Sequence, residues 1–60
     1  MDKERFLTAT DVAAITTLSR SSLHRKVQAG DFPRPIAISD RRKAWKETAV
    51  RQWMAEREAA

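Results

Sequence analysis

The 60-residue chain carries 12 Lys and Arg against 8 Asp and Glu, which gives a formal charge of +4, and it contains no cysteine. A chain of this length buries only about 60% of the surface that its unfolded form exposes, which argues against a second domain and a roomy catalytic cleft. We therefore expect residues 1–60 to form one small basic domain without disulfides or thiolate metal sites.

A first helix is predicted over residues 9–16. Thr8 and Asp11 have the spacing of a capping box, in which each side chain bonds the backbone amide of the other residue. Val12 and Ile15 lie three positions apart, so they share one face of this helix. That face is expected to point into the core.

A second helix follows a short turn at residues 17–18. Ser19 is the N-cap candidate, because its hydroxyl can accept a hydrogen bond from an amide in the first turn, and the helix runs to Ala29. Gly30 is the only glycine in the chain, and it suits the left-handed position that closes a helix. Two short helices joined by such a turn form a helix-turn-helix pattern.

A β-hairpin is expected after the second helix. Two prolines exclude a helix over residues 31–35. Residues 36–45 contain two strand-like runs around a charged turn. Because an isolated two-stranded hairpin is only marginally stable in water, we expect Ile36, Ile38 and Trp45 to pack against the helices.

The last helix is predicted from about Glu47 onward, where Val50, Trp53 and Met54 form one apolar stripe. The order helix, helix, hairpin, helix gives a mainly α fold with a small β-hairpin, which is a winged helix-turn-helix architecture. The expected core consists of Leu7, Val12, Ile15, Leu18, Leu23, Val27, Phe32, Ile36, Ile38, Trp45, Val50, Trp53 and Met54.

The positive charge is concentrated in the middle of the chain. Between residues 19 and 46, eight basic residues oppose two acidic ones, whereas the segments before and after each carry one net negative charge. Such an asymmetry is typical of a surface that meets a polyanion.

The polar face of the second helix is a candidate for reading DNA bases. Leu23 and Val27 define its buried side, and donor side chains fall opposite them on a helical wheel. In the major groove arginine bonds guanine, glutamine bonds adenine, and serine and histidine make single bonds. A solvated helix face would show the same pattern. The candidates on this helix are Arg20, Ser21, Ser22, His24, Arg25 and Gln28, with Ser22 placed to contact phosphate.

The hairpin turn carries three consecutive positive charges, Arg41, Arg42 and Lys43. On a wing beside the second helix they would reach phosphates or the minor groove, where narrow A-tracts attract arginine. The alternative is a solvated turn. Arg34, held between two prolines, is a further candidate for phosphate contact.

Catalysis and cofactor binding are not expected. His24 is the only histidine, the carboxylates are scattered, and neither phosphate-loop nor dinucleotide-binding spacing occurs. We therefore assign no catalytic residue, metal ligand, cofactor or small-molecule substrate. The longest uncharged run, residues 12–19, is far shorter than the ~20 residues that span a bilayer. Acidic residues also interrupt the start of the chain, so we expect a cytoplasmic protein without membrane contact.

Several segments together resemble the AlpA family of small phage and prophage regulators, which are related to excisionases and to the DNA-binding domains of MerR-type regulators. The most specific ones are the Ser-Arg-Ser-Ser-Leu start of the second helix (residues 19–23), the Phe-Pro-Arg-Pro segment (residues 32–35), and the paired Trp45 and Trp53. The resemblance covers roughly residues 5–57.

The resemblance implies a winged helix-turn-helix regulator that binds double-stranded DNA. Its recognition helix, residues 19–29, would enter the major groove, and its wing, residues 36–45, would contact the backbone or the minor groove. Family members commonly have glycine where Thr17 stands. We expect φ to stay negative here, because a β-branched residue is strained at positive φ. His24 replaces a frequent tyrosine, so base preference does not carry over.

Three functions remain open at this point. The first is sequence-specific regulation of transcription, and the second is an excisionase-like role in bending DNA for site-specific recombination. The third is a protein-interaction module, such as an antirepressor, acting through the outer face of the last helix around Arg51, Gln52 and Glu56. A single DNA-binding module of this size buries about 600–1,000 Å², so we expect a homodimer or tandem copies on DNA.

Overall fold

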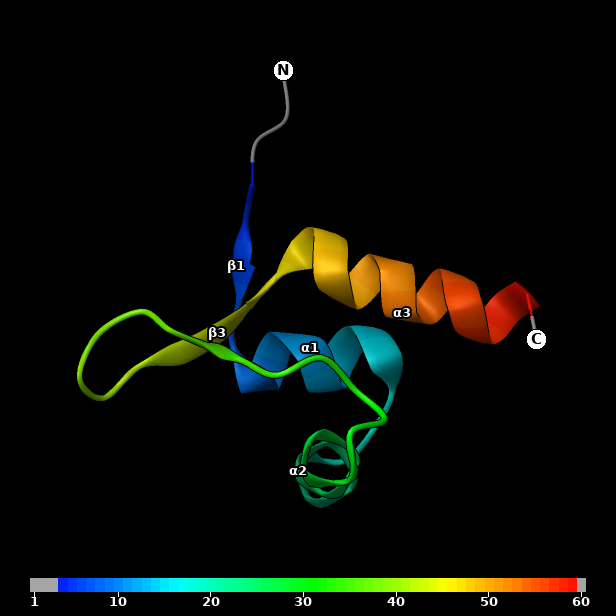
Figure 1. Ribbon diagram of the computed structural model, residues 1–60, viewed down its shortest axis with the longest axis horizontal. Coiled ribbons are helices and arrows are strands. Elements are labelled where there is room, and N and C mark those ends of the chain that lie inside the picture. Colours follow the sequence, from blue (N-terminus) through cyan, green and yellow to red (C-terminus); the bar gives the residue numbers. More distant parts are fainter. Residues whose placement is uncertain (1–3, 60) are drawn as a thin grey trace.

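The first and last of three helices pack against a small antiparallel sheet, and the second helix packs on the first, in the computed structural model, which describes residues 4–59. This mainly helical fold with a β-hairpin confirms the predicted fold class and is compatible with a winged helix-turn-helix. The elements in chain order (Figure 1) are β1 (Phe6–Leu7), α1 (Ala9–Thr16), α2 (Arg20–Ala29), β2 (Ile36–Ala37), β3 (Lys43–Lys46) and α3 (Glu47–Ala59).

The helix α1 begins at the predicted capping box. The Thr8 amide donates to Asp11 Oδ2 at 3.1 Å, and the Asp11 amide donates to Thr8 Oγ1 at 3.2 Å. The helix ends at Thr16 and is capped by Thr17, whose φ of 62° is the only positive φ outside glycine in the described part of the chain. The expectation of negative φ at Thr17 is therefore wrong. The chain passes from the end of α1 to the N-cap of α2 within three residues, and a left-handed residue makes that sharp turn.

The helix α2 is capped at both ends as predicted. Ser19 Oγ accepts from the Ser22 amide at 3.1 Å, and Gly30 adopts the left-handed conformation with φ of 83°. Beyond Gly30, the Asp31 amide donates to the Lys26 carbonyl at 2.8 Å. This bond satisfies a carbonyl of the last turn and sets the direction in which the chain leaves the helix.

The sheet has three strands in the order β1–β3–β2, with both pairs antiparallel. The strands β2 and β3 form the predicted hairpin, and residues 38–42 extend it as a projecting loop (Figure 1). The strand β1 is a structural finding that the sequence pattern does not indicate. Two residues carry no periodicity of their own, so β1 is ordered by its pairing with β3.

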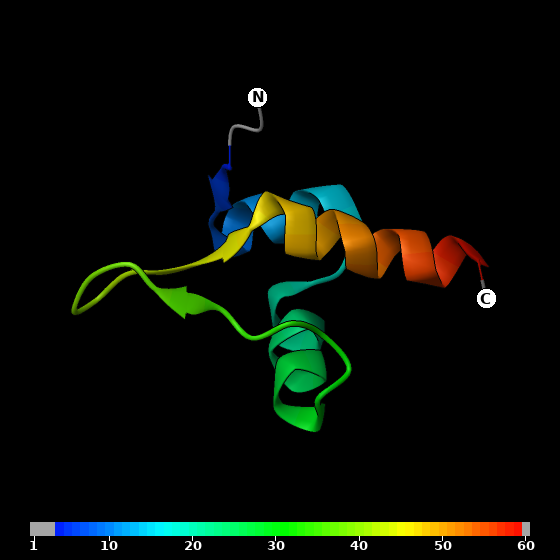
Figure 2. The same cartoon turned by 45° about the horizontal axis from the view of Figure 1, so that its top comes forward.

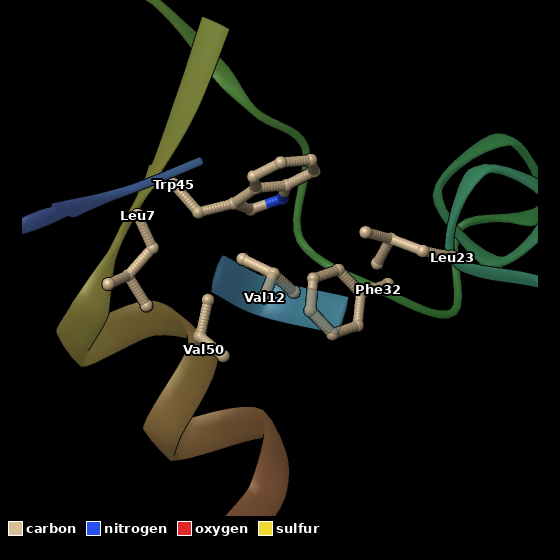
Figure 3. Packing of buried hydrophobic residues seen from close by; sticks show 6 residues of the cluster. All are labelled: Leu7, Val12, Leu23, Phe32, Trp45 and Val50. Atoms are coloured by element: carbon tan, nitrogen blue, oxygen red, sulfur yellow. The ribbon is translucent and has the colours of Figure 1, made fainter. Parts of the chain in front are cut away.

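The core lies between the sheet and the helices. Figure 3 shows its buried side chains, which are Leu7, Val12, Leu23, Phe32, Trp45 and Val50. Five more predicted core residues are partly buried against this cluster: Ile15, Leu18, Val27, Trp53 and Met54.

Two predicted core residues lie outside this cluster. Ile36 is 40% exposed and Ile38 is 46% exposed, so their assignment to the core is wrong. The register pairs Ile36 with Ala44, the neighbour of buried Trp45 on β3. Because neighbouring side chains on a strand point to opposite faces, Ile36 projects from the face of the sheet away from Trp45.

Candidate nucleic-acid interface

The helix α2 presents the predicted polar face to solvent. Five of its six candidate side chains are exposed, and Ser22 is half-buried. The Ser22 amide donates to Ser19 Oγ, and its hydroxyl accepts from the same Ser19 hydroxyl at 3.0 Å. Both polar groups of Ser22 therefore take part in capping the helix. The exposed candidates are Arg20, Ser21, His24, Arg25 and Gln28.

One side of this face lies beside the wing. His24 and Gln28 line a surface hollow together with Arg34, Pro35 and Lys43. A neighbouring hollow holds Arg20 and His24 with Pro35 and Trp45. Because residues four apart lie one above the other on a helix, Arg20, His24 and Gln28 form a single ridge that borders the proline segment and β3. Ser21 and Arg25 line neither hollow.

The wing projects from the body of the protein. Figures 1 and 2 show the β2–β3 loop reaching away from the helices, with α2 on the same side of the sheet as the loop leading into β2. The loop is closed by hydrogen bonds between Ser39 and Arg42, with N–O distances of 3.2 and 3.3 Å. Arg41, Arg42 and Lys43 are all exposed, so the predicted basic tip is free to reach a large ligand.

Two indole rings hold the segment that connects α2 to the wing. Trp45 Nε1 donates to the Pro33 carbonyl at 2.7 Å, and Trp53 Nε1 donates to the Asp31 carbonyl at 2.6 Å. Phe32 lies between these two carbonyls, with ring centroids 6.2 Å from Trp45 and 4.8 Å from Trp53. The connecting segment is thus fixed to β3 and to α3.

Sequence reasoning assigns both tryptophans to the core but misses this polar role. An indole N–H seeks an acceptor when its ring is buried, which was the available signal. Its partner could not be named, because the carbonyls belong to residues 12 and 22 positions away. Arg57 adds to the second contact, since its guanidinium lies 4.9 Å from the Trp53 ring centroid and Nη2 donates to the Asp31 carbonyl at 3.4 Å.

The electrostatics separate the candidate interface from the rest of the molecule. Within residues 4–59, the two recorded ion pairs both involve Glu47, which meets Arg51 at 2.9 Å and Arg5 at 3.9 Å. The basic residues between positions 20 and 46 therefore carry no ion pair in the part of the chain that the structure describes. Their charge is available to an outside anion.

Residues 4–59 were also compared with the requirements of a metal site and of a membrane-spanning helix. Among residues 4–59, no three His, Asp or Glu side chains come together as a metal site requires. No helix of the described chain has the length and apolar character needed to cross a membrane.

The matches to known proteins extend over nearly the whole chain. Residues 5–58 match the model of a family described as Prophage CP4-57 regulatory protein (AlpA). The chain is also 35% identical over 55 residues to an uncharacterized protein, ORF88, of Enterobacteria phage P4. That match covers 92% of this chain and 62% of the phage protein, so the chain spans less than two thirds of this relative's length. No solved structure matches the chain.

Proposed function

The chain belongs to the AlpA family of prophage regulatory proteins, and on this premise we propose that it is a regulator that binds specific sequences in double-stranded DNA. The main support for this proposal is one structural observation. The hollow beside α2 brings His24 and Gln28 of the helix together with Arg34 of the connecting segment and Lys43 of the wing. Groups that can read bases and groups that can hold phosphates thus border one surface.

In the proposed complex α2 lies in the major groove. A helix with its side chains is about 10–12 Å wide and the groove is about 12 Å wide, so the two fit. Arg25 and Gln28 are the side chains that can bond a guanine and an adenine bidentately. Arg20, at the helix N-terminus, is at the end that recognition helices usually point toward the bases.

The wing and the connecting segment supply the phosphate contacts. Arg34, Arg41, Arg42 and Lys43 are exposed and carry no ion pair within the described residues. Binding DNA therefore breaks no salt bridge at these side chains, while each phosphate neutralised releases condensed counterions. These contacts orient α2 on the duplex without reading sequence.

The experiment that tests this assignment compares two arginine variants on two kinds of DNA. Duplexes selected from a random pool by the wild-type protein provide specific sites, and unselected duplex provides the reference. Arg25→Ala should weaken specific binding by about 1–3 kcal/mol and leave random duplex nearly unchanged, because it removes a base contact. Arg42→Ala should weaken binding to both by similar factors.

Arg51→Gln is the matched control, because it removes one positive charge from α3, where Arg51 is paired with Glu47. It should leave both affinities close to the wild-type values. If Arg25→Ala and Arg42→Ala weaken all sequences alike, the separation into base-reading and phosphate-binding residues is wrong. If Arg51→Gln weakens binding as much as Arg42→Ala, net charge alone explains binding and the interface is misplaced. A bend measurement on the selected duplex then separates a transcription regulator from an excisionase-like factor.

A further inference from the structure

The hollow beside α2 has basic and neutral polar walls and no acidic one. Its polar walls are His24 and Gln28 of α2, Arg34 of the connecting segment and Lys43 of β3. The neighbouring hollow adds Arg20, and no carboxylate lines it either. The three charged side chains of this group have no ion pair within residues 4–59. This concave surface therefore attracts anions.

The side chains around the hollow project from backbone that is already ordered. Arg34 lies between two prolines, whose rings fix φ on both sides of it, and Trp45 Nε1 holds the Pro33 carbonyl. Lys43 begins β3 and is paired with β2, and His24 lies in the middle of α2. Because these segments are fixed before any ligand arrives, an anion bound here costs little additional ordering of the backbone.

In the proposed complex a sugar-phosphate strand crosses this hollow. The major groove, which receives α2, is separated from the minor groove by the DNA backbone. Figure 2 shows α2 and the wing projecting in different directions, with the connecting segment running between them. When the helix lies in the major groove and the wing lies on the backbone or in the minor groove, the strand between the two passes over the hollow beside α2.

His24 differs from the other walls because its charge depends on pH. It is the only histidine, and the chain has no cysteine. Histidine is the side chain that ordinarily changes charge between about pH 5 and 8. A neutral imidazole offers one N–H donor and one acceptor, whereas the protonated ring offers two donors and a positive charge.

The surroundings of His24 determine when that positive charge is stabilised. The charged groups that border it are Arg20 on its own helix, Arg34 on the connecting segment and Lys43 on β3, and all are positive. In the protein alone, nothing in the two hollows stabilises a further positive charge. A phosphate placed among these groups reverses that balance, because an anion beside the ring favours its protonated form.

We propose that the hollow beside α2 holds the backbone of one DNA strand, and that His24 binds one of its phosphates in the protonated form. Duplex binding then transfers a proton from the solvent to the free ring nitrogen of His24, so the affinity rises as the pH falls. This inference rests on the proposed function and deepens it, because it assigns His24 to the backbone instead of to a base.

The pH dependence of duplex affinity tests the proposal. A random-sequence duplex of about one turn (~11 bp) is sufficient, because phosphate contacts do not depend on sequence. At constant ionic strength, the wild-type affinity should rise about tenfold from about pH 8 to about pH 5.5, a coupling of about 1.4 kcal/mol between proton and phosphate. A wild-type affinity that is the same at both pH values would overturn the proposal.

Two substitutions of His24 give opposite results that loss of folding cannot imitate. His24→Gln should keep the affinity that the wild type has at about pH 8 and show no rise on acidification. His24→Lys carries a permanent charge, so it should bind at about pH 8 as tightly as the wild type does at about pH 5.5. Arg25→Ala is the control on the same helix, since Arg25 lines neither hollow, and it should retain the full rise. A rise that persists in His24→Gln would overturn the proposal.

The salt dependence shows whether the proton acts at the backbone. Each additional phosphate contact steepens the fall of log affinity with log salt concentration by about 0.9. The wild-type slope should therefore be steeper by about 0.9 at about pH 5.5 than at about pH 8, and the two slopes of His24→Gln should agree. A rise in affinity without a steeper slope would overturn the assignment of His24 to a phosphate.

Titration with tripolyphosphate separates this proposal from the proposed function, because the probe carries phosphates but no base or groove. Followed by nuclear magnetic resonance at about pH 7, it should shift the His24 ring signals toward those of the protonated form. Arg34→Gln should weaken this effect and Arg51→Gln should not. If tripolyphosphate acts in this way but no duplex binds, the proposed function fails and the anion site stands. If duplex binds equally at all pH values and tripolyphosphate leaves the ring unchanged, the anion site fails and the proposed function stands.

Discussion

Replacing Trp45 by phenylalanine removes one hydrogen bond and part of a ring from the centre of the molecule. Trp45 is 6% exposed, and its indole N–H donates to the Pro33 carbonyl at 2.7 Å. Phenylalanine keeps an aromatic ring near Phe32 but leaves the Pro33 carbonyl without this donor. The link between β3 and the segment that follows α2 is then lost.

The expected loss of stability is about 2 kcal/mol. The bond to the Pro33 carbonyl is partly buried, so losing its donor should cost near the lower end of the about 1–3 kcal/mol expected for a buried acceptor. The missing part of the indole removes about 0.8 kcal/mol for each methylene-sized group that was buried. A chain of 60 residues has a total stability of about 3–9 kcal/mol. Because each kcal/mol shifts the melting temperature of so small a domain by about 4–8 °C, the variant should melt about 8–16 °C lower.

Thermal unfolding followed by far-UV circular dichroism measures this shift. Trp53→Phe is the matched control, because the bond from its indole to the Asp31 carbonyl is exposed to solvent, although the Trp53 ring itself is partly buried. Water can replace a donor there, so we expect its melting temperature to fall by less than half as much. Equal shifts in the two variants, or a shift below about 3 °C for Trp45→Phe, would refute the reasoning that the partly buried Pro33 carbonyl depends on this indole.

Two further predictions concern the left-handed residues. Thr17→Gly should raise stability by about 0.5–1 kcal/mol, because it removes about 1–2 kcal/mol of left-handed strain and adds about 0.5–1 kcal/mol of unfolded-state freedom. Thr17→Ala, which keeps the strain, should not melt higher, and a Thr17→Gly protein that melts at or below the wild-type temperature would contradict the account. Gly30→Ala should lower stability by about 1 kcal/mol, since a Cβ at Gly30 meets no atom within 4 Å and only its φ of 83° is unfavourable. Gly30→Asn should lose less in the same melting experiment, because asparagine tolerates this conformation, and equal losses would show that another effect operates.

The parts of the fold that could be predicted from sequence depend on local chemistry. The caps at Thr8, Ser19 and Gly30 involve groups within a few residues of one another, so their spacing is visible in the sequence. The prediction from local chemistry was wrong at Thr17, where the β-branched side chain favours a negative φ but the structure has a positive one. The geometry of the path between two helices outweighed that preference.

The parts that could not be predicted depend on pairing across the chain. The strand β1 exists because residues 6–7 meet β3, and nothing in two residues indicates such a partner. An alternating pattern at Ile36 and Ile38 shows that they share a face, but the register with β3 decides which face it is.

The candidate interface shows the same division. A helical wheel separates the polar face of α2 from Leu23 without any structure. That His24 and Gln28 share a hollow with Arg34 and Lys43 follows from the route of residues 31–35, which the two indole bonds hold in place. This long-range arrangement has no signature in the spacing of the residues.

The proposed binding of duplex DNA through α2 and the wing is best tested by measuring how salt concentration changes the affinity for a short random-sequence duplex. If Arg34, Arg41, Arg42 and Lys43 each neutralise one phosphate, the logarithm of the affinity should fall with the logarithm of salt concentration with a slope of about −3.6. Arg42→Ala should reduce the magnitude of that slope by about 0.9, and Arg51→Gln should leave it unchanged. Binding that is absent, or that does not respond to salt, would contradict the claim.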